Sequence, residues 1–176
     1  MRLFVAVPVP EALREGIALA GGEIAEDGIS LVRPENMHLT LKFIGEVQPQ
    51  ALEEIKKRLE GVKFRKFSCR LRGIGAFPSG DYIRVVWAGG ESGGALEALA
   101  QEVIAALRGF GKDERFTAHL TIARVKKKLD LKRFFEKHKE EDFGSFEVSS
   151  FELIESVLGG PKGPEYRTLA VFEAEK

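Results

Sequence analysis

Met37-His38-Leu39-Thr40-Leu41-Lys42-Phe43 is matched 81 positions later by Ala118-His119-Leu120-Thr121-Ile122-Ala123-Arg124. Both stretches contain the order His-Leu-Thr, although the chain has only three histidines. Alternate side chains of a β-strand point to the same face, so the histidine and threonine of each stretch share one face while the hydrophobic residues turn to the core. We therefore expect two similar strands, each presenting one imidazole and one hydroxyl group on a rigid support.

The rest of the sequence predicts an α+β fold with mainly antiparallel sheets and flanking helices. Short runs rich in β-formers are mixed with amphipathic segments, and several runs are close enough to form hairpins. No linker is long or polar enough to divide the chain, so residues 1–176 are expected to form a single domain. The expected strands are 2–7, 29–33, 38–44, 64–72, 82–88, 118–125, 146–156 and 167–175; the expected helices are 11–26, one that Pro49 opens, 94–107 and 130–139.

The composition limits the class of protein. The chain has 27 basic and 27 acidic residues, so its bulk charge does not indicate nucleic-acid binding, and any RNA contact must be local. A single cysteine, Cys69, excludes an internal disulfide and a four-cysteine zinc site. With no signal peptide and no apolar run of ~20 residues, we expect a soluble, cytoplasmic protein without a membrane partner. Abundant charged residues and a single asparagine are typical of a thermophile.

The paired histidines predict acid–base chemistry on a phosphate. An imidazole titrates near pH ~6.5, so one of a pair can act as general base while the other acts as general acid. Two hydroxyl groups beside them can donate hydrogen bonds to phosphate oxygens. We expect no metal and no cofactor, because threonine is a poor metal ligand and no cysteine or carboxylate completes either stretch.

The two stretches resemble the signatures of the two-histidine phosphoesterase superfamily. The similarity extends to Arg2–Ala6, Pro34–Gly45, Gly73–Pro78, Val85–Gly89 and His119–Arg124, and it is closest to the RNA 2',3'-cyclic phosphodiesterase family, also called 2'-5' RNA ligase-like. This resemblance implies a bilobal, pseudo-twofold fold with a central cleft, and hydrolysis of 2',3'-cyclic phosphate ends of RNA to 2'-phosphates.

The resemblance also implies roles for particular residues. His38 would protonate the departing 3'-oxygen, His119 would activate water, and Thr40 and Thr121 would hold phosphate oxygens. Arg124 matches the arginine that follows the second motif in the family, and it would contact the phosphate or a base.

Arg124 and three further residues carry expectations of their own. Simple alternation places Arg124 on the wrong face of its strand, so the strand must end, twist or bulge if Arg124 is to reach the cleft. Phe4 and Phe43 are candidates for stacking on the terminal base, or else core residues. His138 lies between Lys137 and Lys139 on a charged helix and is expected to be solvated.

Other functions remain compatible with the sequence. The same site could join a 2',3'-cyclic phosphate to a 5'-hydroxyl group, as a 2'-5' RNA ligase acting on tRNA halves. It could act on another cyclic phosphate, such as a small cyclic nucleotide or an ADP-ribose cyclic phosphate, or it could be a non-catalytic module that binds RNA ends. In each case the expected partner is RNA or a nucleotide, with tRNA fragments among the candidates, and the expected state is a monomer.

Overall fold

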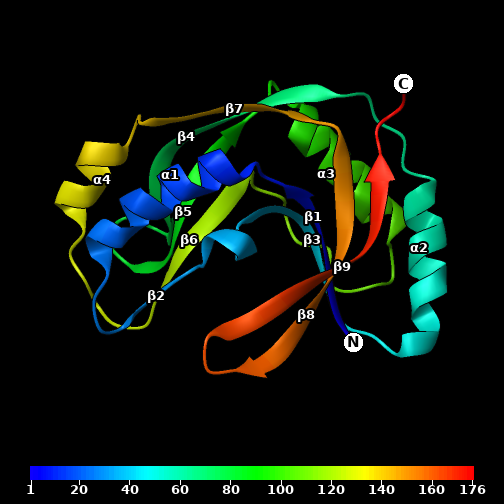
Figure 1. Cartoon of the computed structure of the whole chain (residues 1–176), viewed down its shortest axis with the longest axis horizontal. Helices are drawn as coiled ribbons and strands as arrows, with labels where there is room; N and C mark the ends of the chain where they lie inside the picture. The colour runs from blue at the N-terminus through cyan, green and yellow to red at the C-terminus, as the bar shows by residue number, and fades with distance from the viewer.

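Nine β-strands form one curved sheet in the computed structural model, which describes residues 1–176 (Figure 1). Every pairing between these strands is antiparallel, which confirms the predicted class. The strands are β1 (Arg2–Pro8), β2 (Ile29–Leu31), β3 (His38–Glu46), β4 (Phe67–Pro78), β5 (Ile83–Glu91), β6 (His119–Val125), β7 (Asp142–Val148), β8 (Ser150–Gly160) and β9 (Gly163–Glu173). The helices are α1 (Glu11–Gly21), α2 (Leu52–Glu60), α3 (Ala95–Ala106) and α4 (Lys132–His138), with short 3-10 turns η1 (Gly22–Ile24), η2 (Pro34–Asn36) and η3 (Pro49–Ala51).

The two strands that carry the repeated motifs are neighbours at the centre of the sheet. The strand order is β7-β4-β5-β6-β3-β1-β8-β9, so β6 and β3 each lead outward to three further strands, and β2 pairs with β6. Leu39 of β3 is paired with Leu120 of β6. Because the two strands are antiparallel, a local twofold axis at this leucine pair interchanges the motifs. The two halves of the molecule are therefore joined into one continuous sheet at the point where the motifs meet.

A helix covers the apolar face of each motif strand. Helix α3 packs on β3, and helix α1 packs on β6 (Figure 1). Helix α1 approaches very closely, since a Cβ on Gly21 would lie 2.7 Å from a methyl carbon of Ile122. The glycine that shortens the expected helix 11–26 thus permits this close packing. No helix of the chain is both long and apolar enough to cross a membrane.

The C-terminal region differs from the expected single strand 146–156. Strand β7 pairs with β4 in one half of the sheet, whereas β8 pairs with β1 in the other half. The chain therefore breaks between Val148 and Ser150 in order to change partners. The glycine-rich segment 159–164 forms the tip of the β8–β9 hairpin, which projects from the sheet at the bottom of Figure 1.

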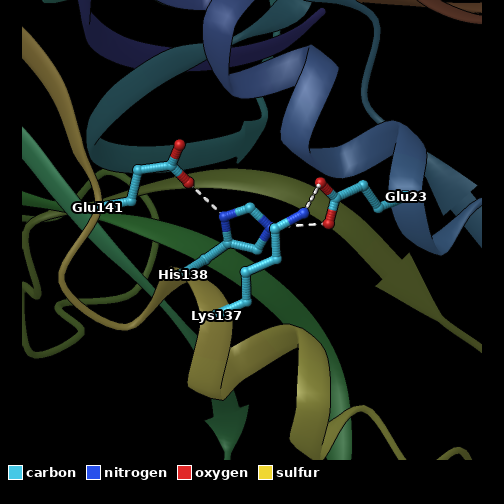
Figure 2. A network of polar contacts seen from close by, with 4 residues as sticks. All are labelled: Glu23, Lys137, His138 and Glu141. Atoms are coloured by element: carbon cyan, nitrogen blue, oxygen red, sulfur yellow. Dashed lines mark hydrogen bonds and ion pairs between the residues drawn. The ribbon is translucent and has the colours of Figure 1, made fainter.

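The expectation that His138 is solvated was wrong. Its side chain is buried where α4 meets the end of α1, and its Nε2 lies 2.8 Å from a carboxylate oxygen of Glu23 (Figure 2). Its Nδ1 contacts the carboxylate of Glu141. Both ring nitrogens can donate to carboxylates only if the imidazole is doubly protonated. Burial lowers the pKa of His138, but the hydrogen bonds to Glu23 and Glu141 outweigh burial and raise it above 6.5.

The stability of the fold should therefore depend on the charge of His138. A raised folded-state pKa stabilises the fold fully below the unfolded-state pKa, and this contribution is lost as pH rises through the folded-state pKa. We expect His138→Gln to lower the free energy of unfolding more at about pH 6 than at about pH 9. Urea denaturation at the two pH values measures this difference, with Lys139→Gln as a control on the neighbouring exposed position. An equal loss at both pH values would contradict the ion-pair assignment.

Candidate active site

Two adjacent hollows lie on the polar face of the central strands. The larger has a volume of about 470 Å³ and the smaller about 80 Å³. They share Thr40 and Phe43 in their walls. Among the residues of the larger hollow are Phe4, Asn36, His38, Thr121, Arg124 and Tyr166, whereas His119 lines the smaller one together with Lys42, Lys112, Arg115 and Thr117. The two histidines thus line different hollows, and Thr40 lies between the hollows and lines both.

The register of the central strands brings both motifs together. Continuing the antiparallel register from the Leu39–Leu120 pair places Thr40 opposite His119 and His38 opposite Thr121. Consistent with this register, Thr40 lines one hollow together with His38 and Thr121 and the other together with His119. All four side chains are partly exposed, while the leucines beside them are buried, as alternation predicts. The polar side chains of both motifs thus gather around the two adjacent hollows.

A backbone carbonyl orients each imidazole in the same way. His38 Nδ1 lies 3.2 Å from the carbonyl oxygen of Asn36, and His119 Nδ1 lies 2.7 Å from that of Thr117. A carbonyl oxygen only accepts hydrogen bonds, so Nδ1 carries the proton and donates it. Nε2 is then left for chemistry in both rings. As the neutral imidazole it accepts a proton, and as the imidazolium it donates one.

The surroundings of both motif histidines lower their pKa values and so favour the neutral imidazole. Burial is the main cause that lowers the pKa of His38, and the positive charge of Arg14 lowers it further. Burial likewise lowers the pKa of His119, with a contribution from Arg124. The hydrogen bonds to the carbonyl groups oppose these effects without cancelling them. A bound anion would act in the opposite direction and favour protonation.

A bulge brings Arg124 to the cleft. Val86 of β5 pairs with Ala123 and Trp87 pairs with Thr121, so Ile122 is an extra residue in β6. Ile122 and Ala123 are consequently both buried, the alternation shifts by one, and Arg124 returns to the exposed face at the larger hollow. This is the irregularity that the sequence required for Arg124 to reach the cleft.

An equivalent bulge occurs in β3. Val5 of β1 pairs with Lys42 and Ala6 pairs with Thr40, which leaves Leu41 as the extra residue. Phe43, five positions after its histidine, is 58% exposed at the mouth of both hollows. Phe43 and Arg124 therefore occupy equivalent positions of the two motifs.

Comparison with known proteins agrees with this geometry. The model of the family described as LigT like phosphoesterase matches residues 7–87. An RNA 2',3'-cyclic phosphodiesterase of Archaeoglobus fulgidus is 44% identical over 98% of this chain and 100% of its own length. The chain belongs to the LigT-like phosphoesterase family. A protein of the same name from Methanocaldococcus jannaschii is 39% identical over 96% of the chain and 98% of its own length. The crystal structure of TT0787 of Thermus thermophilus superposes with a TM-score of 0.83 at 32% identity, covering 98% of this chain and 97% of that one.

Aromatic rings line one side of the larger hollow of this LigT-like chain. Phe4 is buried, and its ring centre lies 4.9 Å from that of Tyr166 in an edge-on arrangement. The Tyr166 ring is also 5.8 Å from that of His38. Of the two phenylalanines proposed from sequence, Phe43 has the exposed surface needed for stacking on a base. Phe4 is buried and packs against the ring of Phe43. On the other side of the cleft, Phe77 meets the His119 ring edge-on at 5.0 Å.

Sequence reasoning missed Tyr166 and Asn36. Tyr166 comes from the hairpin at the far end of the chain, and no local pattern links it to the motifs. Asn36 Nδ2 donates to the carbonyl oxygen of Pro164 at 3.0 Å, which fixes the hairpin beside the hollow. The signal for Asn36 was its position two residues before His38 and its being the single asparagine of the chain. No group of three or more potential metal ligands of the types His, Cys, Asp and Glu is present.

The three histidines should titrate in two separate ranges. We expect His38 and His119 to have pKa values below about 6.5 in the ligand-free protein, because both are desolvated, and His138 to have one above it. NMR titration of the three imidazole resonances, assigned with His→Gln variants, measures all three. Adding inorganic phosphate should raise the two lower values. A ligand-free pKa well above 6.5 for either motif histidine would contradict the geometry described above.

Proposed function

We propose that this protein hydrolyses the 2',3'-cyclic phosphate at the end of an RNA chain and releases an RNA 2'-phosphate. The observation that carries the proposal is the pair of imidazoles at equivalent positions of β3 and β6, each with Nδ1 bound to a backbone carbonyl and Nε2 free. Relatives that span almost the whole chain are named for this activity, which supports the same substrate class.

The sizes of the two hollows suggest which part of the reaction each serves. Pockets that bind small molecules usually measure about 300–1,000 Å³, and the larger hollow, at about 470 Å³, has room for the terminal nucleoside. The smaller hollow, at about 80 Å³, falls well below this range for a nucleoside but is large enough for water. The nucleoside would therefore lie beside His38, with its base against Phe43 or Tyr166, and the attacking water beside His119.

The chemistry follows from this placement. His119 Nε2 takes a proton from water as the water oxygen attacks phosphorus from the side of the smaller hollow. The bond between phosphorus and the 3'-oxygen breaks on the opposite side, and His38, as imidazolium, gives the 3'-oxygen its proton through Nε2. The product is a 2'-phosphate monoester with a free 3'-hydroxyl group. Because the substrate phosphate is an anion, its binding favours the protonation of His38, whose pKa is low in the free protein.

The remaining polar groups would hold the phosphate. Thr40 and Thr121 can donate hydrogen bonds to its non-bridging oxygens from opposite sides of the strand pair. Arg124 has no acidic partner in the structure and lines the larger hollow, so its guanidinium is free to bind the phosphate.

Substituting Arg124 by Ala should lower kcat/KM for 2',3'-cyclic AMP by ~10- to 100-fold. Lys at this position should restore only part of the lost kcat/KM, because its ammonium group lacks the planar fork of the guanidinium. Steady-state kinetics measure this, and full recovery with Lys would contradict a bidentate contact.

Hydrolysis is favoured over the alternative activities by the same dimensions. The smaller hollow, at about 80 Å³, is well below the usual size of a nucleoside site, so water would enter it more readily than the 5'-terminal nucleoside of a second strand, and 2'-5' ligation would be the minor reaction. Two titratable groups with free Nε2 atoms exceed what a module that only binds RNA ends requires. Both halves of residues 1–176 contribute to one site, so a single chain would act alone, as a monomer. The proposed substrates are cytoplasmic RNA fragments, including tRNA halves.

Loss of either motif histidine should abolish turnover. We expect His38→Ala and His119→Ala each to lower kcat by ~100- to 10,000-fold, because each removes one proton-transfer group. The assay uses a short RNA ending in a 2',3'-cyclic phosphate, run with and without EDTA, with chromatographic separation of 2'- and 3'-phosphate products. Activity should be the same in EDTA.

The third histidine provides the control for this experiment. His138→Gln, at a site remote from both hollows, should keep wild-type turnover at a temperature where it is folded. Release of a 3'-phosphate, or activity that vanishes in EDTA and returns with zinc, would refute the proposed reaction.

A further inference from the structure

Lys42 is a buried lysine directly after the first motif. Its side chain is 2% exposed, and Nζ donates to Asp113 Oδ1 at 2.9 Å and to the carbonyl oxygen of Lys112 at 3.1 Å. The equivalent position of the second motif is Ala123, which is also buried. An apolar residue is thus compatible with the bulged strand. Burying a cation costs free energy that its partners only partly return, so the lysine needs a reason beyond the fold.

The partners of Lys42 lie in the loop 111–118, which leads into His119. This loop contacts β3 closely at its start: a Cβ on Gly111 would lie 2.7 Å from the carbonyl oxygens of Phe43 and Ile44. At its end, the carbonyl oxygen of Ala118 accepts a hydrogen bond from the Gly90 N–H at 3.1 Å.

Between these two ends, only two kinds of hydrogen bond hold the loop. Lys42 Nζ donates to residues 112 and 113, and His119 Nδ1 donates to the carbonyl oxygen of Thr117. The Thr117 carbonyl orients His119, and it belongs to a loop whose other hydrogen bonds in this stretch come from Lys42. The position of this carbonyl therefore depends on Lys42.

We propose that the Lys42–Asp113 ion pair is a positioning device for His119, which links the first motif strand to the loop that orients the histidine of the second. This inference rests on the proposed function, in which His119 activates water. The ion pair fixes loop residues 112–117, and this loop supplies both the Thr117 carbonyl and one wall of the smaller hollow. It thereby keeps His119 Nε2 directed at the attacking water and keeps this wall of the smaller hollow in place.

Loosening the loop would have a specific chemical consequence. Burial is the main cause of the lowered pKa of His119, so a loop that admits solvent would let this pKa rise toward its ordinary value. The charged groups around His119 are Arg124, farther along the same strand, and Lys42, Lys112, Glu114 and Arg115 around the smaller hollow. Phe77 packs on the ring from β4 and carries no charge.

The test compares Lys42→Met, Asp113→Asn and Asp113→Glu. Lys42→Met should melt near the wild-type temperature, because the carboxylate that it leaves unpaired, Asp113, is 53% exposed and can be hydrated. It should nevertheless lower kcat for 2',3'-cyclic AMP by ~10- to 100-fold, as small displacements of a reacting group do, with KM changed by less than about threefold. The acidic limb of its kcat/KM profile should move to higher pH. Asp113→Asn should show a smaller change in the same direction, and Asp113→Glu should keep most of the activity, because residue 113 is partly exposed and has room for a longer carboxylate.

The pair formed by Arg70 and Asp142 gives a matched control. It has a similar separation of 2.7 Å, joins distant parts of the chain, and lies between β4 and β7 away from both hollows. Arg70→Met should leave kcat and the pH profile at wild-type values.

Two outcomes would overturn the inference. One is a kcat within twofold of wild type in both Lys42→Met and Asp113→Asn, with an unmoved acidic limb. The other is an NMR titration of His119 that is the same in Lys42→Met and wild type, and this measurement does not depend on turnover. If the wild type fails to turn over any cyclic phosphate, the proposed function fails, and the NMR comparison still decides whether Lys42 positions His119.

Discussion

The pairing of Leu39 with Leu120 is the contact on which the site depends. Burying a leucine side chain stabilises the fold by about 1.5–3 kcal/mol, and both leucines are almost completely buried. A shift of either strand by one residue would turn these leucines to solvent and the imidazoles into the core, so burial fixes the register. The hydrophobic residues of each motif thereby determine where its polar residues lie. Because the paired strands are antiparallel, two copies of one short motif are sufficient to form a cleft with two histidines and two threonines.

The two bulges then make the halves of the site different. In each strand the extra residue comes three positions after the histidine, and alternation resumes with its phase changed. The fifth position after each histidine returns to the cleft, where one motif supplies Phe43 and the other supplies Arg124. The fourth position turns inward, where one motif has Lys42 and the other has Ala123. A repeated backbone geometry thus carries an aromatic surface on one side and a cation on the other, which suits a ligand with a base at one end and a phosphate at the other.

Local patterns in the sequence were sufficient for those features that depend on neighbours in the chain. Period-two alternation predicted the partly exposed faces of both motifs. Arg124 lies an odd number of positions after His119, so the same alternation indicated that the strand must be irregular if Arg124 is to reach the cleft. Contacts between distant segments could not be predicted in this way. The two lysines beside His138 are typical of a solvated helix face, but Glu23 approaches from 115 positions away and makes the buried charge favourable. Tyr166 and Asp113 escaped notice for the same reason, since each reaches the site through a hairpin or loop whose position is set by tertiary packing.

Desolvation explains why both histidines need their carbonyl partners. Burial favours the neutral form of an imidazole, and it is the main cause that lowers the pKa values of both His38 and His119. The Nδ1 hydrogen bonds leave Nε2 of both rings free to exchange a proton. In the proposed reaction, the substrate phosphate would stabilise a proton on the ring nearest the leaving oxygen, while the other ring would stay neutral and act as the base. A symmetric pair of strands would in this way perform an asymmetric reaction, because the two hollows beside the histidines differ in size.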